Sequence, residues 1–360
     1  MNLVFEHETL GQRVLFGTGL ARQNVAAEVL RLKARRVMVI VAGYEASIAR
    51  HVTADIKVLL TYDGVVQHVP VAKAEDARAL AQENEVDLLV AIGGGSTTGL
   101  AKAVALTTGI PIVAVPTTYA GSEATNVWGL TEAARKVTGV DSRVLPRTVI
   151  YDAALTFSLP PELSVASGLN ALAHCIDSLW APRADPINQA LAAEGIRALA
   201  AGLPLVAGDP TGVRGREQAL YGAYLAAVAF ASAGSGLHHK ICHVLGGTYN
   251  LPHAQTHAVV LPYVLAFNAP FARAADDRIA QALGSASGLE GLNRLRRALD
   301  APIALRDYGF EESSIPEAVG LILAAAPASN PRAVTGENLT TLLKAAHAGA
   351  APQTILEDIS

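Results

Sequence analysis

Histidine side chains gather in one short stretch of this chain, GLHHKICHVLGGTYNLPHAQTH, which begins at Gly236. The chain has ten histidines, and this stretch holds His238, His239, His243, His253 and His257. His239 and His243 are four residues apart, so on a helix they share one face. Imidazoles gathered in this way suit metal ligation or proton transfer near neutral pH. A chance cluster of surface histidines is the alternative reading.

The residues between these histidines indicate how the stretch folds. Apolar Ile241, Val244 and Leu245 favour a helix that is at least partly buried. Gly246-Gly247 predicts the end of that helix, and Pro252 places His253 in the turn that follows. A second fragment, SGLNALAHCIDS, carries Asn170 and His174, which are also four residues apart on a predicted helix. The sequence therefore predicts that several imidazoles come together in one place.

A glycine-rich turn follows a predicted buried strand at residues 86–92. Gly93, Gly94, Gly95 and Ser96 precede a helical run, TTGLAKAVALTT. Glycines at a strand-to-helix turn let a phosphate approach the backbone, and a helix N-terminus favours negative charge. A plain tight turn is the alternative, because the pattern is not a GxGxxG fingerprint.

Hydroxyl side chains mark the end of the next predicted strand, in PTTYAGSE. Thr117, Thr118 and Ser122 there suit hydrogen bonds to a nucleotide. The cofactor's adenosine end is expected after the early strand RVMVIVA, where NAD-specific sheets place a carboxylate. This chain has Gly43 and Tyr44 there and no carboxylate before Glu45, so NADPH is not strongly excluded.

Composition bounds the class of protein. Hydrophobic residues make up 51% of the chain and charged residues 17%, which favours a compact globular protein. No unbroken apolar run reaches the ~20 residues of a transmembrane helix, and Glu6 and Glu8 stand where a signal peptide is basic. Cys175 and Cys242 make no disulfide framework, and the net charge of −4 gives no nucleic-acid footprint. We expect a cytoplasmic protein with neither a membrane nor a nucleic-acid partner.

The order of predicted elements indicates two domains. Residues 1–155 alternate strand and helix, which predicts a doubly wound parallel sheet of the Rossmann-like kind that binds nucleotides. The predicted strands are Arg36–Ala42, Val65–Val71, Val86–Ile92, Pro111–Val115 and Thr148–Tyr151. NVWGLTE and KVTGV predict a hairpin around Ala133-Ala134. Residues 156–360 carry the histidines in an all-α domain, whose predicted helices are 162–181, 186–207, 215–232, 237–246, 257–287, 289–299 and 313–326.

These motifs together resemble the iron-containing alcohol dehydrogenase family, which shares its two-domain plan with dehydroquinate synthase. That family holds a metal with four residues, and the matching positions here are Asn170, His174, His239 and His253. Asn170 stands where metal-binding members have Asp, so a divalent cation loses an anionic ligand. A second departure is Gly99, which replaces the Asp of the motif GGGS-x-x-D-x-A-K. The TTxxGSE motif is kept, and Lys136 stands where a lysine that contacts the cofactor is expected.

Within the family, Asn170 and the residues of the other motifs resemble those of the maleylacetate reductases, which work without a bound metal. The resemblance implies that NADH or NADPH reduces the carbon–carbon double bond of the dicarboxylate maleylacetate to 3-oxoadipate, in degradation of aromatic compounds. It also implies a homodimer. His243 and His253 are then expected to donate to the substrate, while His174 and His239 shape or charge the pocket. Protonated histidines and, less strongly, Lys240 would supply positive potential for the dianion.

Two other activities remain open on this fold. One is a metal-dependent alcohol or polyol dehydrogenase, which analysis of bound metal separates from the metal-independent reductase. The other is a lyase like dehydroquinate synthase, which only recycles its nucleotide, so net consumption of NAD(P)H excludes it. A binding protein without catalysis explains neither the GGGS turn nor the histidines.

Overall fold

The computed structural model describes residues 4–67, 69–132 and 135–357 of the 360-residue chain. The chain divides into two compact units. We call residues 9–160 together with 210–220 the sheet unit. The helical unit consists of residues 161–209 and those from Tyr221 onward, together with the N-terminal residues up to Glu8.

The sheet unit is built on one parallel sheet with the order β1-β8-β5-β4-β2-β3. Its strands are β1 (Arg13–Phe16), β2 (Val37–Val41), β3 (Val58–Tyr62), β4 (Leu88–Gly93), β5 (Ile112–Pro116) and β8 (Thr148–Tyr151). Its helices are α1 (Ala21–Arg31), α2 (Ala46–Val52), α3 (Val71–Glu83) and α4 (Gly95–Thr108). The doubly wound parallel sheet that the sequence predicts is confirmed.

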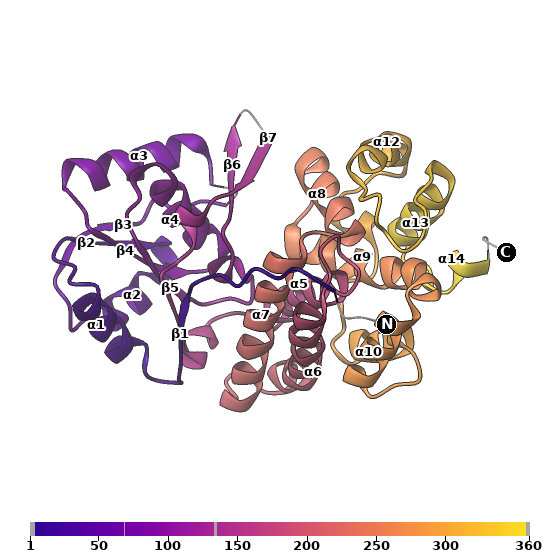
Figure 1. Cartoon of the computed structure of the whole chain (residues 1–360), viewed down its shortest axis with the longest axis horizontal. Coiled ribbons are helices and arrows are strands. Elements are labelled where there is room, and N and C mark those ends of the chain that lie inside the picture. The colour runs from indigo at the N-terminus through magenta and orange to yellow at the C-terminus, as the bar shows by residue number, and fades with distance from the viewer. Residues whose placement is uncertain (1–3, 68, 133–134, 358–360) are drawn as a thin grey trace. The chain divides into compact units, whose positions relative to one another are not determined.

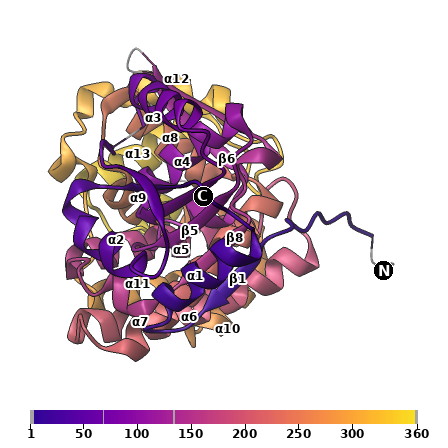
Figure 2. The ribbon, with the colours of Figure 1, turned by 90° about the vertical axis from the view of Figure 1, so that its left-hand side faces the viewer.

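Helices cover both faces of this sheet, α3 and α4 on one side and α1 and α2 on the other (Figure 1; Figure 2). Strands β2 and β4 are buried along their whole length. Alternate residues of each strand enter opposite cores, so that Met38 and Leu89 pack under α3 and α4 while Val39 and Val90 pack against α1. Burial on both faces is the reason that these strands are continuous apolar runs.

Two edge strands depart from the sequence prediction. The prediction of a strand at Val65–Val71 is wrong: none of the described residues there forms a strand, and Val71 already begins α3. The strand in this region is β3 (Val58–Tyr62). β3 pairs on one side with β2 and alternates between partly covered and exposed residues, so it lacks the apolar signal of a central strand. β1 has no predicted counterpart for the same reason, since two of its residues are exposed and the other two are only partly covered.

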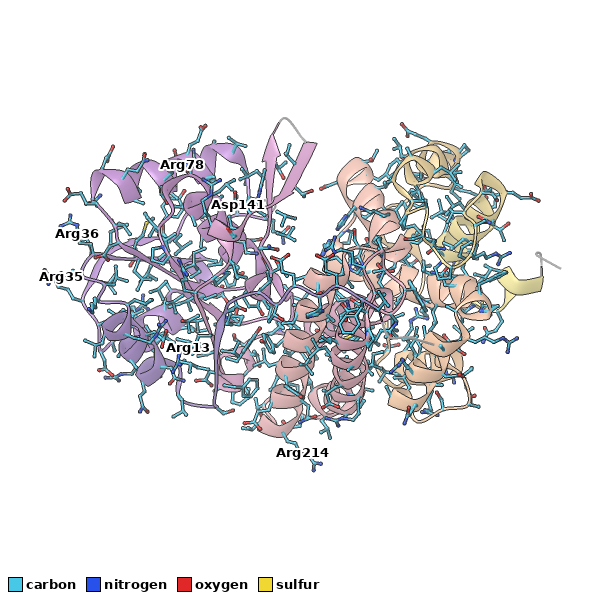
Figure 3. The ribbon with its side chains drawn as sticks, in the orientation of Figure 1. Arg13, Arg35, Arg36, Arg78, Asp141 and Arg214 are labelled. Atoms are coloured by element: carbon cyan, nitrogen blue, oxygen red, sulfur yellow. The ribbon has the colours of Figure 1, made fainter. Side chains whose placement is uncertain are left out.

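A buried carboxylate ties edge strand β1 to its neighbours. Glu28 on α1 accepts a hydrogen bond from Thr148 Oγ1 on β8 at 2.6 Å and pairs with Arg31 Nη2 at 2.7 Å. Arg13 on β1, labelled in Figure 3, lies 3.2 Å from the same carboxylate. Burial alone would raise the pKa of Glu28, but the bonds from Arg31 and Thr148 bring that pKa below its ordinary value.

The predicted hairpin is present as β6 (Val127–Glu132) and β7 (Arg135–Val140), which pair antiparallel. Its turn, predicted at Ala133-Ala134, lies outside the described residues. A bridge between Pro70 and Thr131 connects the hairpin to the segment before α3. The hairpin is therefore an addition to the sheet unit and does not extend the parallel sheet.

The helical unit carries no strand among its described residues, which agrees with the predicted all-α region. Its helices are α5 (Pro161–Ser178), α6 (Pro186–Gly208), α8 (Leu237–Tyr249), α9 (His253–Asn268), α10 (Arg273–Leu283), α11 (Gly288–Ala298), α12 (Ile315–Ala325), α13 (Gly336–Ala348) and α14 (Thr354–Glu357). α7 (Val213–Ala233) begins in the sheet unit and ends in the helical unit. By length and composition α6, or the bent pair α7 and α8, would pass for a membrane span. A core helix passes the same test, and α6 packs against α5 and α10.

Two helix predictions need correction, and α13 has no predicted counterpart. The single helix predicted at 257–287 is two helices, because the segment Ala269–Phe271 forms a separate 3-10 turn that contains Pro270. α8 runs through Gly246-Gly247 to Tyr249, where packing against α9 and α12 outweighs the cost of two glycines. α13 was not predicted, although Thr335 caps it with a reciprocal pair of hydrogen bonds to Asn338.

Candidate active site

Six histidines lie together in the helical unit, on three helices. They are His174 on α5, His238, His239 and His243 on α8, and His253 and His257 on α9. The ring of His239 is central, with centroids 4.8 Å from His174, 5.0 Å from His257 and 6.1 Å from His243. The ring of His253 lies 4.3 Å from that of His257. His253 is the first residue of α9 and not part of a turn, which corrects its predicted position.

Asp177 fixes the start of α8 beside α5. Its Oδ2 accepts a hydrogen bond from the backbone N–H of Gly236 at 2.8 Å and lies 2.7 Å from His239 Nδ1. A side chain at Gly236 would collide with this carboxylate, because a Cβ there would lie 2.8 Å from Asp177 Cγ. Asp177 is absent from the predicted site residues, although it follows His174 by three residues and thus lies on the same side of α5.

The buried imidazoles are neutral. Burial, with a smaller contribution from neighbouring imidazoles, lowers the pKa of His238 to about 3 and holds the pKa values of His174, His239 and His257 well below the ordinary value. These four rings therefore do not supply the positive potential that we expect from protonated histidines. The side chains of His243 and His253 are exposed and that of His174 is partly exposed, so the two rings proposed as donors are the most exposed of the six.

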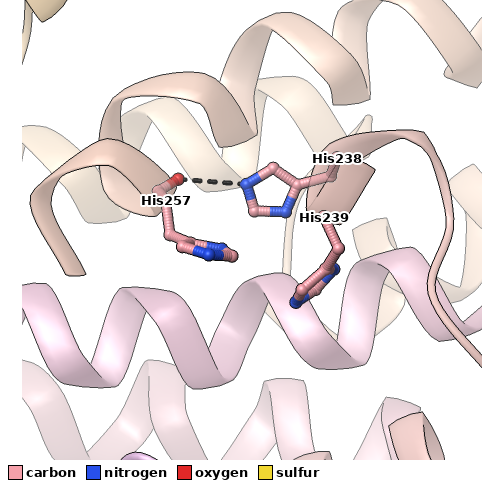
Figure 4. Close-up of side chains that lie close together, drawn as sticks. All are labelled: His238, His239 and His257. Carbon is pink, nitrogen blue, oxygen red and sulfur yellow. Dashed lines mark hydrogen bonds between the residues drawn. The ribbon is translucent and has the colours of Figure 1, made fainter. Parts of the chain in front are cut away.

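Hydrogen bonds orient the inner rings. His239 Nδ1–H donates to Asp177, which leaves Nε2 as the lone-pair nitrogen. His238 Nε2–H donates to the backbone carbonyl of His257 at 3.2 Å (Figure 4). In the described part of the chain His239 Nε2, His238 Nδ1 and both ring nitrogens of His257 have no hydrogen-bond partner. The pocket thus presents several uncommitted polar atoms to a ligand.

The four positions that match the family's metal ligands do not fit a divalent cation well. Asn170 is buried, and its Oδ1 has no partner among the described residues, yet an amide oxygen contributes no charge. The rings of His174 and His239 are stacked with an interplanar angle of 18°. The weakness of these four positions as a divalent site therefore lies in the uncharged oxygen of Asn170.

A different trio has the spacing of a nitrogen-ligand set. Ring nitrogens of His238, His239 and His257 lie within 4.8 Å of one another, and all three residues are buried (Figure 4). Three imidazoles match the number of protein ligands in a catalytic zinc site. This trio shares only His239 with the four positions expected from the resemblance, so it gives no support to that site as a whole.

The predicted phosphate turn lies in the sheet unit, between β4 and α4. Gly93 has φ of +150°, and a Cβ there would lie only 2.8 Å from Glu45 Oε2. A Cβ at Gly94 would lie 2.9 Å from Thr118 Cγ2. Gly94 caps α4 without a side-chain hydrogen bond, so the first backbone N–H groups of α4, including that of Ser96, face outward without a side-chain acceptor. This is the arrangement that binds phosphate.

The hydroxyl motif follows β5, next to this turn. Thr117 Oγ1 donates to Glu45 Oε1 at 2.5 Å, so its hydroxyl proton is already committed within the protein. The side chain of Thr118 lies against Gly94. Ser122 begins the 3-10 turn Ser122–Ala124, and its carbonyl accepts from Thr125 Oγ1 at 3.2 Å. The structure thus brings Thr117 and Thr118 to the glycine turn, while Ser122 shapes the loop beyond them.

Two lysines, Lys102 and Lys136, belong to the motifs that resemble the family, and the structure describes the side chain of Lys102 alone. Lys102 is fully buried, and its Nζ donates to the carbonyls of Thr125 at 2.8 Å and Val127 at 2.7 Å. Burial lowers its pKa to about 7, an effect that the charge of Glu123 partly offsets. Lys102 therefore secures the loop and does not face a ligand. Lys136 lies in β7 opposite Thr131, and its side chain is outside the described part of the structure.

Comparison with known proteins gives concordant matches along the chain. Residues 11–153 match the iron-containing alcohol dehydrogenase family, and residues 164–347 match the C-terminal domain of the Fe-containing alcohol dehydrogenase family. Maleylacetate reductase of Sphingobium indicum is 45% identical over 352 residues, which cover 97% of this chain and 99% of that protein.

Two solved structures have the same fold. An iron-containing alcohol dehydrogenase from Corynebacterium glutamicum is 63% identical, with a TM-score of 0.98 over 99% of this chain and 100% of that one. A maleylacetate reductase from Agrobacterium tumefaciens is 36% identical, with a TM-score of 0.93 over 98% of this chain and 100% of that one. The sequence and structural matches agree over both halves, and the chain therefore belongs to the iron-containing alcohol dehydrogenase family, whose members are NAD(P)-dependent oxidoreductases.

Proposed function

We propose that this protein is an oxidoreductase that reduces the carbon–carbon double bond of maleylacetate to 3-oxoadipate with NADH or NADPH, without a bound metal, in the degradation of aromatic compounds. The observation that carries the proposal is the similarity to maleylacetate reductases over nearly the full length of both chains. The uncharged Asn170, at the position where metal-binding members have Asp, supports the metal-independent form.

The histidine pocket suits this chemistry. A bound reduced nicotinamide supplies hydride to the double bond that is conjugated with the ketone, which leaves an enolate to be stabilised on oxygen and protonated on carbon. His243 and His253, which are exposed, donate to the enolate oxygen and return the proton from solvent. The neutral rings of half-buried His174 and buried His239 position the substrate, with Asp177 holding the ring of His239.

The phosphates of the cofactor are held by the glycine turn at Gly93, Gly94, Gly95 and Ser96, with Thr117, Thr118, Ser122 and Lys136 beside the nucleotide. The substrate is a dianion, and Lys240 on α8 supplies positive charge near His239, since its charge contributes to lowering the pKa of that histidine. We also propose a homodimer in the cytoplasm with neither a nucleic-acid nor a membrane partner. Buried, free Cys175 and Cys242 suit a reducing compartment.

The decisive experiment follows the absorbance of reduced nicotinamide with maleylacetate, using NADH and NADPH, with and without EDTA. Oxidation of cofactor that depends on maleylacetate and survives EDTA is expected, with 3-oxoadipate as product. Activity that EDTA abolishes and added zinc or iron restores would favour the metal-dependent alcohol dehydrogenase. That alternative draws support from the name of the Corynebacterium glutamicum neighbour, and a parallel assay with primary alcohols and NAD⁺ tests it directly. A lyase would show no net consumption of cofactor.

A further inference from the structure

A carboxyl oxygen without a partner faces the glycine turn in the sheet unit. Glu45 ends the 3-10 turn Gly43–Glu45, which directly follows β2, and only 6% of its surface is exposed. Its Oε1 accepts the hydrogen bond from Thr117, but its Oε2 has no hydrogen-bond partner in the described residues. Oε2 points at Gly93, where a Cβ would lie 2.8 Å away. A buried acid therefore holds one unused oxygen against the turn proposed to bind phosphate.

A diphosphate at this turn creates an electrostatic conflict with an ionised Glu45. The uncapped N–H groups at the start of α4 draw the anion to the turn. An ionised carboxylate beside it would repel the diphosphate, and low local polarity strengthens that repulsion. A neutral carboxyl group removes the repulsion and adds a donor, because its O–H can bond to a phosphate oxygen.

Cationic neighbours do not resolve this conflict. The ionisable side chains on the elements around Glu45 are Tyr44 in its own turn, Arg50 and His51 on α2, and Lys102 on α4. Arg50 and His51 are exposed, and Lys102 is bonded to carbonyls of the loop at Thr125 and Val127. In the described part of the chain no cation forms an ion pair with Glu45. Burial raises the pKa of Glu45, and the bond from Thr117 offsets only part of that rise.

We propose that Glu45 binds the nucleotide in its neutral form, with Oε2–H donating to a non-bridging oxygen of the dinucleotide's diphosphate. The inference rests on the proposed use of a nicotinamide dinucleotide. No covalent bond other than O–H changes: the carboxylate takes one proton from solvent, and Thr117 continues to donate to Oε1. Because the neutral form binds, affinity is complete below the pKa of Glu45 in the free protein. Above that pKa it falls, by up to about tenfold per pH unit.

The test measures binding of ADP-ribose to the full-length protein by calorimetry from about pH 6 to about pH 9, a range in which its phosphodiesters stay ionised. The wild type should lose affinity as the pH rises and take up as much as about one proton per ligand, read from buffers of different ionisation enthalpy. Glu45→Gln presents an amide N–H at every pH, so its affinity should be independent of pH without proton uptake. Glu83→Gln, an exposed acid at the end of α3, should match the wild type.

Two results would overturn the proposal. An equal pH slope in wild type and Glu45→Gln would show that Glu45 is not the linked group. Weaker binding by Glu45→Gln at every pH would show that an ionised carboxylate accepts from ribose hydroxyls. Thr117→Val provides a second check, because losing the donor to Oε1 should raise the pKa of Glu45 and move the fall in affinity to higher pH. If the affinity of Thr117→Val falls at the same pH as that of the wild type, the proposal is contradicted. Binding of ADP-ribose does not depend on turnover of maleylacetate. The binding measurement therefore tests the role of Glu45, and the absorbance assay tests the proposed reaction independently.

Discussion

Asp177 on α5 and His239 on α8 lie 2.7 Å apart, Oδ2 to Nδ1, and both side chains are buried. The two residues are 62 positions apart in the sequence. The carboxylate fixes the tautomer of the central ring and also accepts the backbone N–H of Gly236, so one side chain aligns both the helix and the imidazole. Burial raises the pKa of Asp177, while His238 and the N–H of Gly236 act against that rise.

Asp177→Asn should lower kcat by about 10–100-fold, the usual effect of losing a partner that orients a site imidazole. The amide has a single oxygen, so if that oxygen faces Gly236 and His239, the N–H₂ group meets Trp180 Nε1, which donates to Oδ1 in the wild type. Steady-state kinetics and thermal unfolding are measured together, with exposed Asp307→Asn as the control. A lower melting temperature with unchanged kcat would limit Asp177 to a structural role.

His243→Ala and His253→Ala should each lower kcat by about 10²–10⁴-fold, the range for a lost general acid or electrostatic donor. Both side chains are exposed, so folding should be unchanged, and NADH affinity should stay near that of the wild type. Turnover of maleylacetate and NADH binding are the measurements. His51→Ala on α2, another exposed histidine, is the matched control. Near-normal turnover in both variants would show that the donors lie elsewhere.

Asn170→Asp should tighten the binding of divalent metal, because it restores an anionic oxygen at nearly constant volume in the buried position. The wild type, purified without added metal, should carry well under one equivalent of zinc or iron. The variant should bind more and reduce maleylacetate more slowly, since metal-bound imidazoles are withdrawn from the substrate. Elemental analysis and EDTA treatment check this. Stoichiometric metal in the wild type, with activity lost to EDTA and restored by metal, would contradict it.

Gly43→Asp should raise KM for NADPH far more than for NADH, because a carboxylate at the adenosine end repels a 2′-phosphate. Gly43 is exposed, and an added Cβ would meet no atom within 4 Å, so the substitution is sterically tolerated. Gly43→Asn has the same shape without the charge and should leave the ratio of the two KM values near that of the wild type. An equal rise for both cofactors in Gly43→Asp would place Gly43 away from the adenosine.

The local sequence pattern by itself determined the central strands, the glycine turn and the pairing of site residues along helices. The central strands β2, β4 and β5 are continuous apolar runs because both of their faces are buried, and the glycine turn follows β4 where the sequence predicts it. Spacing of four residues was enough to place Asn170 with His174, and His239 with His243, along shared helices. These features depend on neighbours within one or two turns of chain, which the sequence displays directly.

Tertiary contacts decided the rest. β3 is a strand because β2 offers it a pairing edge, not because its own residues are strongly apolar. α8 continues through Gly246-Gly247 because packing outweighs local propensity. The inner rings are neutral because helices from distant parts of the chain exclude water from them. Contacts such as Asp177 to His239, or Glu45 to Gly93, join residues whose spacing carries no periodic signal, so only the folded chain brings them together.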